Sequence, residues 1–342
     1  MSQQRKSVRV VIVNWRTPLL TERAARSLWP QLRAGDELVV VDNASASADP
    51  HDNSLAHLRR LGAKLGSAGP ARFGLVQSRR NGGFGYGVNL GARNLRQDAL
   101  VLLNSDAYAL EGFVEALTAP LGHDLVEATT ARLLLEGRWR LVGDGVEAQT
   151  EPAATTQSTG SAQLRGLDGG IWVSDPSGVE LINSTGNIVD ACGNGYDRSW
   201  LAPAKQEHDS PEVFGICGGA CAISARAWRQ LNGMRQDLFM YYEDTDFSYR
   251  LRRAGYRVQY VRQAQARHAH AASSDSASAA FTTWNTRNRL RVATRYAPAS
   301  VAARALVNTG GRILLGPQRQ ARAQGLVQAL AHAPQDLYAR IG

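Results

Sequence analysis

Runs of apolar residues that end abruptly in polar ones recur through the first third of the chain. The clearest are residues 8–13, 37–41, 73–76 and 99–103, and the last of these is apolar throughout. A strand covered on both faces needs no alternation of apolar and polar residues, a condition typical of parallel sheets wrapped by helices. Pro18 opens a helical segment between the first two runs, which implies a right-handed βαβ crossover. The pattern predicts an α/β fold with a mixed, mainly parallel sheet flanked by helices.

Polar side chains follow these runs, at the end of the strands where ligands bind in open parallel sheets. They include Asn14, Asp42, Asn81 and the triplet Asn104-Ser105-Asp106. The Asp106 carboxylate suits a hard divalent cation that itself holds phosphate oxygens, although it could instead cap a helix beginning near Ala109. Asp42 suits a hydrogen bond to a nucleoside, with a helix cap as the competing role.

The segment 79–87 is rich in glycine and has two arginines beside the glycines. Glycine lets backbone N–H groups approach a phosphate closely, so this loop suits a phosphorylated ligand. The segment lacks the G-x-G-x-x-G fingerprint, which would follow the first strand, where the chain has Asn14-Trp15-Arg16-Thr17. A nicotinamide-dependent oxidoreductase is therefore disfavoured.

A second informative block lies between residues 214 and 246. Residues 214–221 are small or uncharged, which allows another backbone or a ligand to come close. Glu243 and Asp244 follow four large apolar residues, and a carboxylate held against apolar surface is a better proton acceptor because its charged form is disfavoured. The competing role is electrostatic, because acids at the start of the amphipathic helix 247–254 favour its dipole.

Three further segments have simpler interpretations. Residues 258–261 read as a strand, after which His268 and His270 could ligate a metal or face solvent. Residues 150–170 are rich in Thr, Ser, Gly, Gln and Ala without periodicity, which predicts an exposed insertion. Residues 192–197 are expected to form a turn.

Composition adds little until charge is considered. The 342 residues are 44% hydrophobic and 20% charged, which is ordinary for a globular protein. The three cysteines form no framework and no zinc spacing, so we expect them to be buried apolar residues in a reducing compartment. No apolar run approaches the roughly 20 residues that span a bilayer. The sequence predicts a soluble, cytoplasmic protein.

The positive charge is concentrated at the C-terminal end. Residues 276–342 hold nine arginines, no lysine and one acid, Asp336, in a chain of net charge +9. Such a tail suggests a polyanionic neighbour, namely an anionic membrane face, a lipid diphosphate or nucleic acid, unless it is simply a solvated basic helix. Residues 298–332 predict two short helices with breaks at Gly310-Gly311 and Gly316-Pro317. They could rest on an anionic leaflet, pack on the rest of the chain, or form a dimer contact.

With these pieces in place, the chain resembles the family 2 glycosyltransferases, in particular the rhamnosyltransferase-like branch, whose fold is GT-A. The resemblance covers residues 8 to about 298. The stretches that carry it are Val13-Asn14-Trp15, Val41-Asp42-Asn43-Ala44-Ser45, Asn81-Gly82-Gly83-Phe84 with Asn89, Asn104-Ser105-Asp106, Gly218-Gly219-Ala220-Cys221, Tyr242-Glu243-Asp244-Thr245-Asp246-Phe247 with Arg250, His268, and Arg287-Asn288.

The resemblance implies a role for each matching residue. Those implied to bind the nucleotide sugar are Asn14, Asp42, Asn81, Gly82, Asn89, Asn104 and Ser105, with Arg287 and Asn288 at the diphosphate. Asp106 matches the last acid of the family's D-x-D motif, whose first acid is replaced here by Asn104. His268 would complete a site for Mg²⁺ or Mn²⁺. Asp244 matches the general base of inverting members, Glu243 would support the base or the acceptor, and Gly219 and Ala220 would contact the acceptor.

The resemblance also implies an organisation and a function. Residues 1–275 would be a GT-A catalytic domain, with a nucleotide-sugar half to about residue 110 and an acceptor half beyond it, and residues 276–342 a basic helical extension. The expected activity is transfer of rhamnose or a similar sugar from a UDP- or dTDP-sugar to a hydroxyl of a glycan or a polyprenyl-diphosphate-linked acceptor. Cell-surface polysaccharide synthesis at the inner face of the cell membrane, without a nucleic-acid partner, is the expected setting.

One alternative of another class stays open. A non-catalytic sugar- or nucleotide-binding module would keep Asp42 and the glycines, but it has no need of Glu243 and Asp244 beside His268. Binding of a nucleotide sugar without turnover would favour this alternative.

Overall fold

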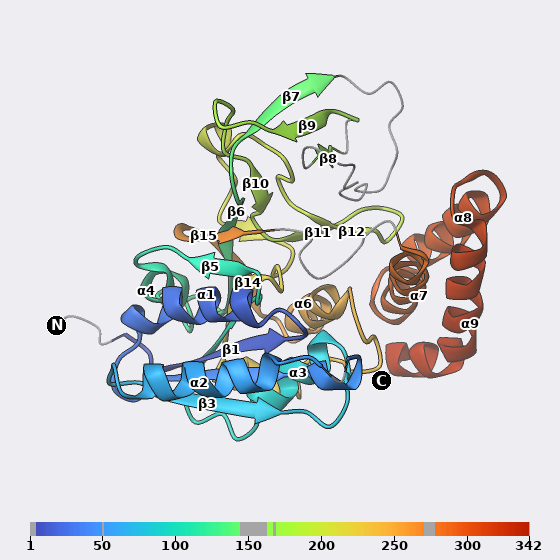
Figure 1. The fold of residues 1–342 in the computed structure, drawn as a ribbon. Helices are drawn as coiled ribbons and strands as arrows, with labels where there is room; N and C mark the ends of the chain where they lie inside the picture. Colours follow the sequence, from blue (N-terminus) through green and yellow to red (C-terminus); the bar gives the residue numbers. More distant parts are fainter. Residues whose placement is uncertain (1–4, 50, 144–162, 167–168, 270–277, 342) are drawn as a thin grey trace.

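The computed structural model describes residues 5–49, 51–143, 163–166, 169–269 and 278–341 (Figure 1). The expected boundary at residues 275–276, His270 and residues 150–162 of the expected insertion lie outside the described residues.

A 10-stranded sheet runs through the described part of the chain, in the order β13-β15-β6-β14-β4-β1-β2-β3 with β10 and β5 paired to β6 and β15. Its parallel half contains β1 (Val8–Asn14), β2 (Glu37–Asp42), β3 (Arg72–Gln77) and β4 (Ala99–Leu103). All four were predicted from the apolar runs. The register places Asn14 beside Asp42 and Asp42 beside Gln77, so the polar strand ends meet at one edge.

The other half of the sheet is mixed. β14 (Ala220–Ser224) runs antiparallel to both β4 and β6 (Val126–Leu135), and β15 (Arg257–His268) is parallel to β6. The short strands that complete it are β5 (Ala107–Ala109), β10 (Ile182–Ser184) and β13 (Glu212–Val213). β15 is longer than the predicted strand 258–261, so His268 ends the strand and pairs with Ala107 of β5.

Two small sheets lie outside the central one. One pairs β11 (Asn187–Val189) with β12 (Gly195–Asp197), and the other contains β7 (Trp139–Gly143), β8 (Gln163–Arg165) and β9 (Ile171–Ser174). Two expectations are therefore wrong in part. The 192–197 turn ends in a strand, and residues 163–165 of the expected irregular insertion form β8, because each segment finds a strand partner elsewhere in the chain.

Helices cover both faces of the sheet, as predicted. One apolar cluster joins alternate residues of β1 to α1 (Pro18–Leu28), α2 (Ser54–Gly66) and α4 (Phe113–Thr118). The cluster on the opposite face contains α3 (Phe84–Gly91), α5 (Ala225–Gln230) and α6 (Glu243–Arg253). Short 3₁₀ turns occur at η1 (Trp29–Gln31), η2 (Ser45–Ser47) and η3 (Ala204–Gln206). The predicted fold class is confirmed.

Three helices form the C-terminal extension, which stands at one side of the sheet (red, Figure 1). They are α7 (Ala279–Tyr296), α8 (Ala299–Leu315) and α9 (Arg319–Ile341). The predicted break at Gly310-Gly311 is wrong, because both glycines lie inside α8, whereas the chain does turn between Gly316 and Gln318. No helix in the described ranges is long and apolar enough to cross a membrane.

Three of the nine arginines of the extension are internal. Arg289, Arg291 and Arg322 are buried. Asp336 is fully buried and accepts a hydrogen bond of 2.9 Å from the Arg291 Nε. A buried cation must be paired or hydrogen-bonded to be tolerated, so these arginines depend on partners inside the fold and add little to the surface potential of the extension.

Candidate active site

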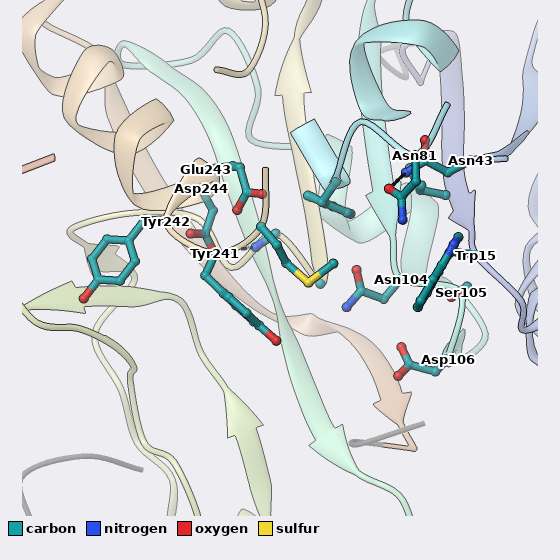
Figure 2. A pocket seen from close by; sticks show the side chains of 15 residues that line it. Trp15, Asn43, Asn81, Asn104, Ser105, Asp106, Tyr241, Tyr242, Glu243 and Asp244 are labelled. Atoms are coloured by element: carbon teal, nitrogen blue, oxygen red, sulfur yellow. Dashed lines mark hydrogen bonds between the residues drawn. The ribbon is translucent and has the colours of Figure 1, made fainter. Parts of the chain in front are cut away.

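A pocket of about 270 Å³ opens at the carboxyl ends of β1, β2 and β4 (Figure 2). Two groups of side chains face each other across it. What we call the β-wall contains Trp15, Asn43, Asn81, Asn104, Ser105 and Asp106. The α6-wall contains Met240, Tyr241, Tyr242, Glu243 and Asp244.

Asn14 and Asp42 lie behind the β-wall and do not line the pocket. The Asn14 amide is fully buried and donates to Asp42 Oδ1 at 3.0 Å and to Ser45 Oγ at 3.1 Å. Its own Oδ1 accepts a hydrogen bond from Thr21 at 2.8 Å. Asp42 also accepts from Ser45 Oγ at 2.5 Å. These bonds use the hydrogen-bonding groups of the Asn14 amide and fix the end of β2. The residue after β2 lines the pocket.

That next residue, Asn43, was not among the predicted ligand contacts. Its Nδ2 donates to Asn81 Oδ1 at 3.0 Å and to the Gly83 carbonyl at 3.1 Å, which joins the end of β2 to the glycine segment. Trp15, which follows β1, was missed in the same way. Trp15 directly follows β1 and Asn43 directly follows β2, one residue beyond the polar residues Asn14 and Asp42 that the sequence singled out, so strand position was the signal that could have identified them.

Gly83 brings the two walls into contact. Its φ is +85°, and a Cβ at this position would lie 1.7 Å from the Phe239 carbonyl oxygen. The next amide, that of Phe84, donates to the same oxygen at 2.9 Å. Glycine is therefore required at position 83 by both conformation and space. The predicted contact Gly82 stands beside it, outside the pocket lining, against the Tyr86 ring.

Asp106 and His268, 162 residues apart, meet at the rim of the sheet. The His268 Nε2 lies 2.9 Å from Asp106 Oδ1, and its Nδ1 lies 2.6 Å from Asn183 Oδ1. The Nδ1 carries a proton, because a carbonyl oxygen can only accept. Burial lowers the pKa of His268, but the adjacent Asp106 charge and hydrogen bond outweigh it, so the net pKa is raised.

The Asp106–His268 pair fits a divalent cation that is shared with a ligand. A histidine whose second nitrogen donates to a carbonyl oxygen is the usual arrangement at metal sites. No group of three or more His, Cys, Asp or Glu side chains suited to a metal occurs among the described residues. Two protein ligands suit Mg²⁺ or Mn²⁺, which complete their coordination with phosphate oxygens and water.

Asp244 projects from the first turn of α6. Its Oδ2 accepts from the Gly218 amide at 3.0 Å, and its Oδ1 accepts from the Thr245 amide at 2.7 Å. Burial raises the pKa of Asp244, and these hydrogen bonds lower it only in part. A raised pKa strengthens a carboxylate as a proton acceptor. Gly219, predicted to contact an acceptor, lines the pocket beside Asp244, whereas Ala220 is fully buried at the start of β14.

Glu243, the neighbouring acid, is in a different electrostatic state. Only 4% of the residue is exposed, and its Oε1 has no hydrogen-bond partner within the described structure. Burial raises the pKa of Glu243 to about 8, and the charges of Asp244 and Asp246 act in the same direction. A pKa of about 8 leaves Glu243 largely protonated at pH 7, and burial raises the pKa values of both adjacent carboxyl groups.

A third acid, Asp197, was not predicted as a site residue. Burial raises its pKa to about 6, a hydrogen bond with Ser184 lowers it, and the Asp244 charge raises it again. Asp197 ends β12, in the segment expected to be a turn. No local sequence pattern identifies Asp197 as a neighbour of Asp244. The two residues come close only because the small β11–β12 sheet packs against the start of α6.

The backbone before α6 is strained. Phe239, Tyr241 and Tyr242 have φ values of 67°, 71° and 71°. For bulky residues, sparsely populated conformations of this kind cost on the order of 1–3 kcal/mol each and persist only where the surroundings enforce them. They place Tyr241 and Tyr242 in the pocket lining next to Glu243.

The remaining predicted contacts lie away from the pocket. Asn89 exchanges hydrogen bonds of 2.8 and 2.9 Å with the Met234 backbone. Asn288 is fully buried and donates to carbonyl oxygens of the strained segment, and the Arg287 guanidinium donates to the Leu238 carbonyl. Neither Arg287 nor Asn288 lines the pocket.

Comparisons with known proteins agree with the fold. A family model described as the N-terminal domain of galactosyltransferase matches residues 205–272, which include α6 and β15. No curated protein matches the chain in sequence.

Several solved structures share the arrangement. The mannosyltransferase PcManGT from Pyrobaculum calidifontis, solved with GDP-Man and Mn²⁺, is 14% identical with a TM-score of 0.52 over 99% of this chain and 87% of that one. GalNAc-T7, solved with UDP, GalNAc and Mn²⁺, is 13% identical with a TM-score of 0.58 over 99% of this chain and 58% of that one. S. aureus TarS 1-349 is 13% identical with a TM-score of 0.50, over 97% and 81%. These likenesses, together with the mixed sheet and its flanking helices, identify the fold as GT-A.

Proposed function

We propose that the protein is an inverting glycosyltransferase that moves a sugar from a nucleotide sugar to an acceptor hydroxyl. The observation that carries the proposal is the presence of two acids on opposite walls of one pocket, Asp244 on the α6-wall and Asp106 on the β-wall (Figure 2). The β-wall, with its indole ring and amides, suits a nucleoside, and the GT-A neighbours crystallised with GDP-Man or with UDP and GalNAc support this donor class.

The Asp106–His268 pair would hold Mg²⁺ or Mn²⁺ at the β-wall, with Asn104 beside it. A cation there would neutralise negative charge on the departing nucleoside diphosphate. Asn43 and Asn81 would orient the nucleoside, and the buried Asn14–Asp42 pair would keep the end of β2 in place for them.

Asp244 would act as the general base. Its carboxylate takes the proton of the acceptor hydroxyl, the hydroxyl oxygen forms a bond to the anomeric carbon, and the bond from that carbon to the diphosphate oxygen breaks. Attack from the side opposite the leaving group inverts the anomeric configuration. The hydrogen bonds from the Gly218 and Thr245 amides orient the Asp244 carboxylate for this role. Glu243, being largely neutral, would contact the acceptor without competing for its proton.

The donor and acceptor classes follow from the family resemblance. We propose rhamnose or a similar sugar on UDP or dTDP, and a glycan or polyprenyl-diphosphate-linked acceptor in cell-surface polysaccharide synthesis, on the cytoplasmic side of the membrane. Exposed apolar side chains on α8 and α9 support contact with an anionic leaflet: Val307, Leu314, Leu315, Val327 and Tyr338 are each at least 66% exposed. The one acid of these two helices, Asp336, is fully buried, so no described carboxylate would repel the lipid.

A donor screen tests the proposal. Purified protein is incubated with Mn²⁺ and a panel of UDP-, GDP- and dTDP-sugars, and both the melting temperature and the released nucleoside diphosphate are measured. We expect one donor class to raise the melting temperature and to release its diphosphate faster when acceptor is added. Stabilisation by a nucleotide sugar without turnover on any glycan or lipid-linked acceptor would favour a binding module instead.

A further inference from the structure

The α6-wall is formed by a segment whose backbone is strained. Residues 238–242 have no glycine, yet Phe239, Tyr241 and Tyr242 adopt left-handed backbone conformations. Met240 and both tyrosines line the pocket. The segment continues directly into α6, so its conformation sets where Glu243 and Asp244 begin. Whatever enforces this conformation also determines the shape of the pocket.

One buried side chain on α7 contacts this segment at three points. The Asn288 Nδ2 donates to the carbonyl oxygens of Leu238 at 3.0 Å, Met240 at 2.8 Å and Tyr241 at 2.8 Å. Carbonyls so close in sequence can converge on one amide only when the backbone between them is tightly curled. The Asn288 Oδ1 accepts from the Arg287 Nε at 2.8 Å, which fixes the amide so that its N–H groups face the segment.

The same face of α7 packs on the segment through aromatic rings. The Phe281 ring meets the edge of the Tyr241 ring at 4.8 Å, and the Trp284 ring lies 4.9 Å from the Phe239 ring. Positions 281, 284 and 288 are spaced by three and four residues, so they share one face of the helix. Rings hold the side chains of the segment while Asn288 holds its carbonyls.

A buried ion network holds α7 itself in position. Arg291, one turn beyond Asn288, donates to Asp336 of α9 at 2.9 Å and to Asp237 at 2.6 Å. Arg235 bridges Asp336 at 3.4 Å and Asp246 of α6 at 3.3 Å. These ion pairs tie α7 and α9 to the first turn of α6, and the Arg291, Asp336 and Asp246 side chains in them are buried and little screened by water.

We infer that Asn288 is a positioning residue for the acceptor side of the pocket, through which the C-terminal extension sets the α6-wall. The inference rests on the proposed function and assigns Asn288 a role other than contact with the donor diphosphate. On this inference the C-terminal extension holds the α6-wall in place. A substitution in α7 should therefore change the KM for the acceptor, while the β-wall continues to bind the nucleotide.

The test compares Asn288→Ala with Asn285→Ala. Asn285 lies on the same helix, and its side chain makes no hydrogen bond within the described part of the chain, so its variant is a matched control. Asn288→Ser, which keeps one donor, is the milder form. For each full-length protein we would measure amide hydrogen exchange across residues 238–246, the dissociation constants of UDP and dTDP with Mn²⁺, and the KM values for donor and acceptor.

For Asn288→Ala we expect faster exchange confined to residues 238–246 and an acceptor KM raised about tenfold or more, because the Met240 and Tyr241 carbonyls lose the hydrogen bonds that Asn288 donates. The dissociation constants of UDP and dTDP and the donor KM should stay within about twofold of wild type, a split that general loss of stability would not produce. Asn288→Ser should be intermediate and Asn285→Ala unchanged.

Three results would overturn the inference. Weakened UDP or dTDP binding to the same degree as the acceptor would place Asn288 at the diphosphate after all. Unchanged exchange at residues 238–246 would show that the segment keeps its shape unaided. Failure of both Asn288 variants to fold would assign the residue to global stability. A wild-type chain that transfers no sugar would refute the proposed function. The exchange measurement would still test whether Asn288 holds the conformation of residues 238–242.

Discussion

The two walls of the pocket carry the two acids to which we assign the proposed chemistry, Asp106 and Asp244, but the chain holds the walls in place by different means. The β-wall is built where parallel strands end: Trp15 follows β1, Asn43 follows β2, residues 104–106 follow β4, and Asn81 lies in the loop after β3. The α6-wall begins in a strained segment in which three carbonyls accept hydrogen bonds from Asn288, which lies 47 to 50 residues away in sequence. The order and register of the parallel strands determine where the β-wall residues lie. The position of the α6-wall depends on side-chain contacts with α7, which is distant in sequence.

This difference has a functional consequence. A wall set by strand register is rigid, because any shift would break the ladder that joins β1 to β2 and β4. A wall held by side-chain contacts is easier to adjust by substitution. We therefore expect changes on the β-wall to affect the donor and its metal, and changes on the α6-wall to affect chemistry and acceptor.

The largest effect is expected at Asp244. Asp244→Asn keeps the size and hydrogen-bonding reach of the side chain but removes the proton acceptor, so turnover should fall by roughly 10²–10⁴. Donor affinity should be nearly unchanged, since the β-wall is intact. Initial rates and calorimetric titration of the donor check both parts. Glu115→Gln, which alters an exposed carboxylate on α4, serves as the control. Near-normal turnover of Asp244→Asn would contradict the assignment of Asp244 as the general base.

The corresponding change on the β-wall should act on the donor. Asp106→Ala leaves His268 alone at the metal position, and affinity for the nucleotide sugar with Mn²⁺ should fall roughly 10- to 100-fold. Excess EDTA should abolish transfer by the wild-type protein, and added Mn²⁺ or Mg²⁺ should restore it. Full activity in EDTA would mean that Asp106 and His268 pair with each other and do not hold a cation.

A smaller effect is expected on the outer face of the extension, away from both walls. Leu314→Gln with Leu315→Gln should reduce binding to anionic vesicles about tenfold, because these two residues are 70% and 87% exposed and would lose apolar burial in lipid. Leu19→Gln, at a site 72% exposed on α1, is the control. If the double variant instead converts a dimer into a monomer and vesicle binding is unaltered, the face joins two copies of the chain.

The smallest effect concerns protonation of the α6-wall. Glu243 has a folded pKa of about 8 against an ordinary value of 4.5, so unfolding releases a proton between these pH values. Its contribution to stability is complete below pH 4.5 and is lost as pH rises toward 8. Glu243→Gln cannot titrate, and its melting temperature should fall less between pH 5 and pH 8 than that of wild type. An identical fall in both proteins would show that Glu243 ionises normally.

Much of the β-wall could be predicted from sequence. Mainly apolar runs identified four strands, and the polar residues that follow them include Asn81, Asn104, Ser105 and Asp106, which line the pocket. Asn14 and Asp42 illustrate the limit of that rule. A strand end fixes which edge a residue reaches, but the neighbouring Ser45 and Thr21 decide whether its side chain faces the ligand or the interior.

The support of the α6-wall could not be predicted in the same way. Glu243 and Asp244 were evident because acids after four large apolar residues are unusual. Asp197 and the role of Asn288 depend on the packing of β12 and α7, for which periodicity gives no signal. The charge of the extension shows a related limit, since composition counts arginines without indicating that Arg289 and Arg291 are buried.

The most direct measurement is the anomeric configuration of the product, determined by NMR for the donor that the screen identifies. An acceptor hydroxyl activated by Asp244 attacks from the wall opposite the diphosphate, so the account predicts a glycoside of configuration opposite to that of the donor. A product that retains the donor configuration would contradict the central claim, because the two walls would then not act on opposite faces of the sugar.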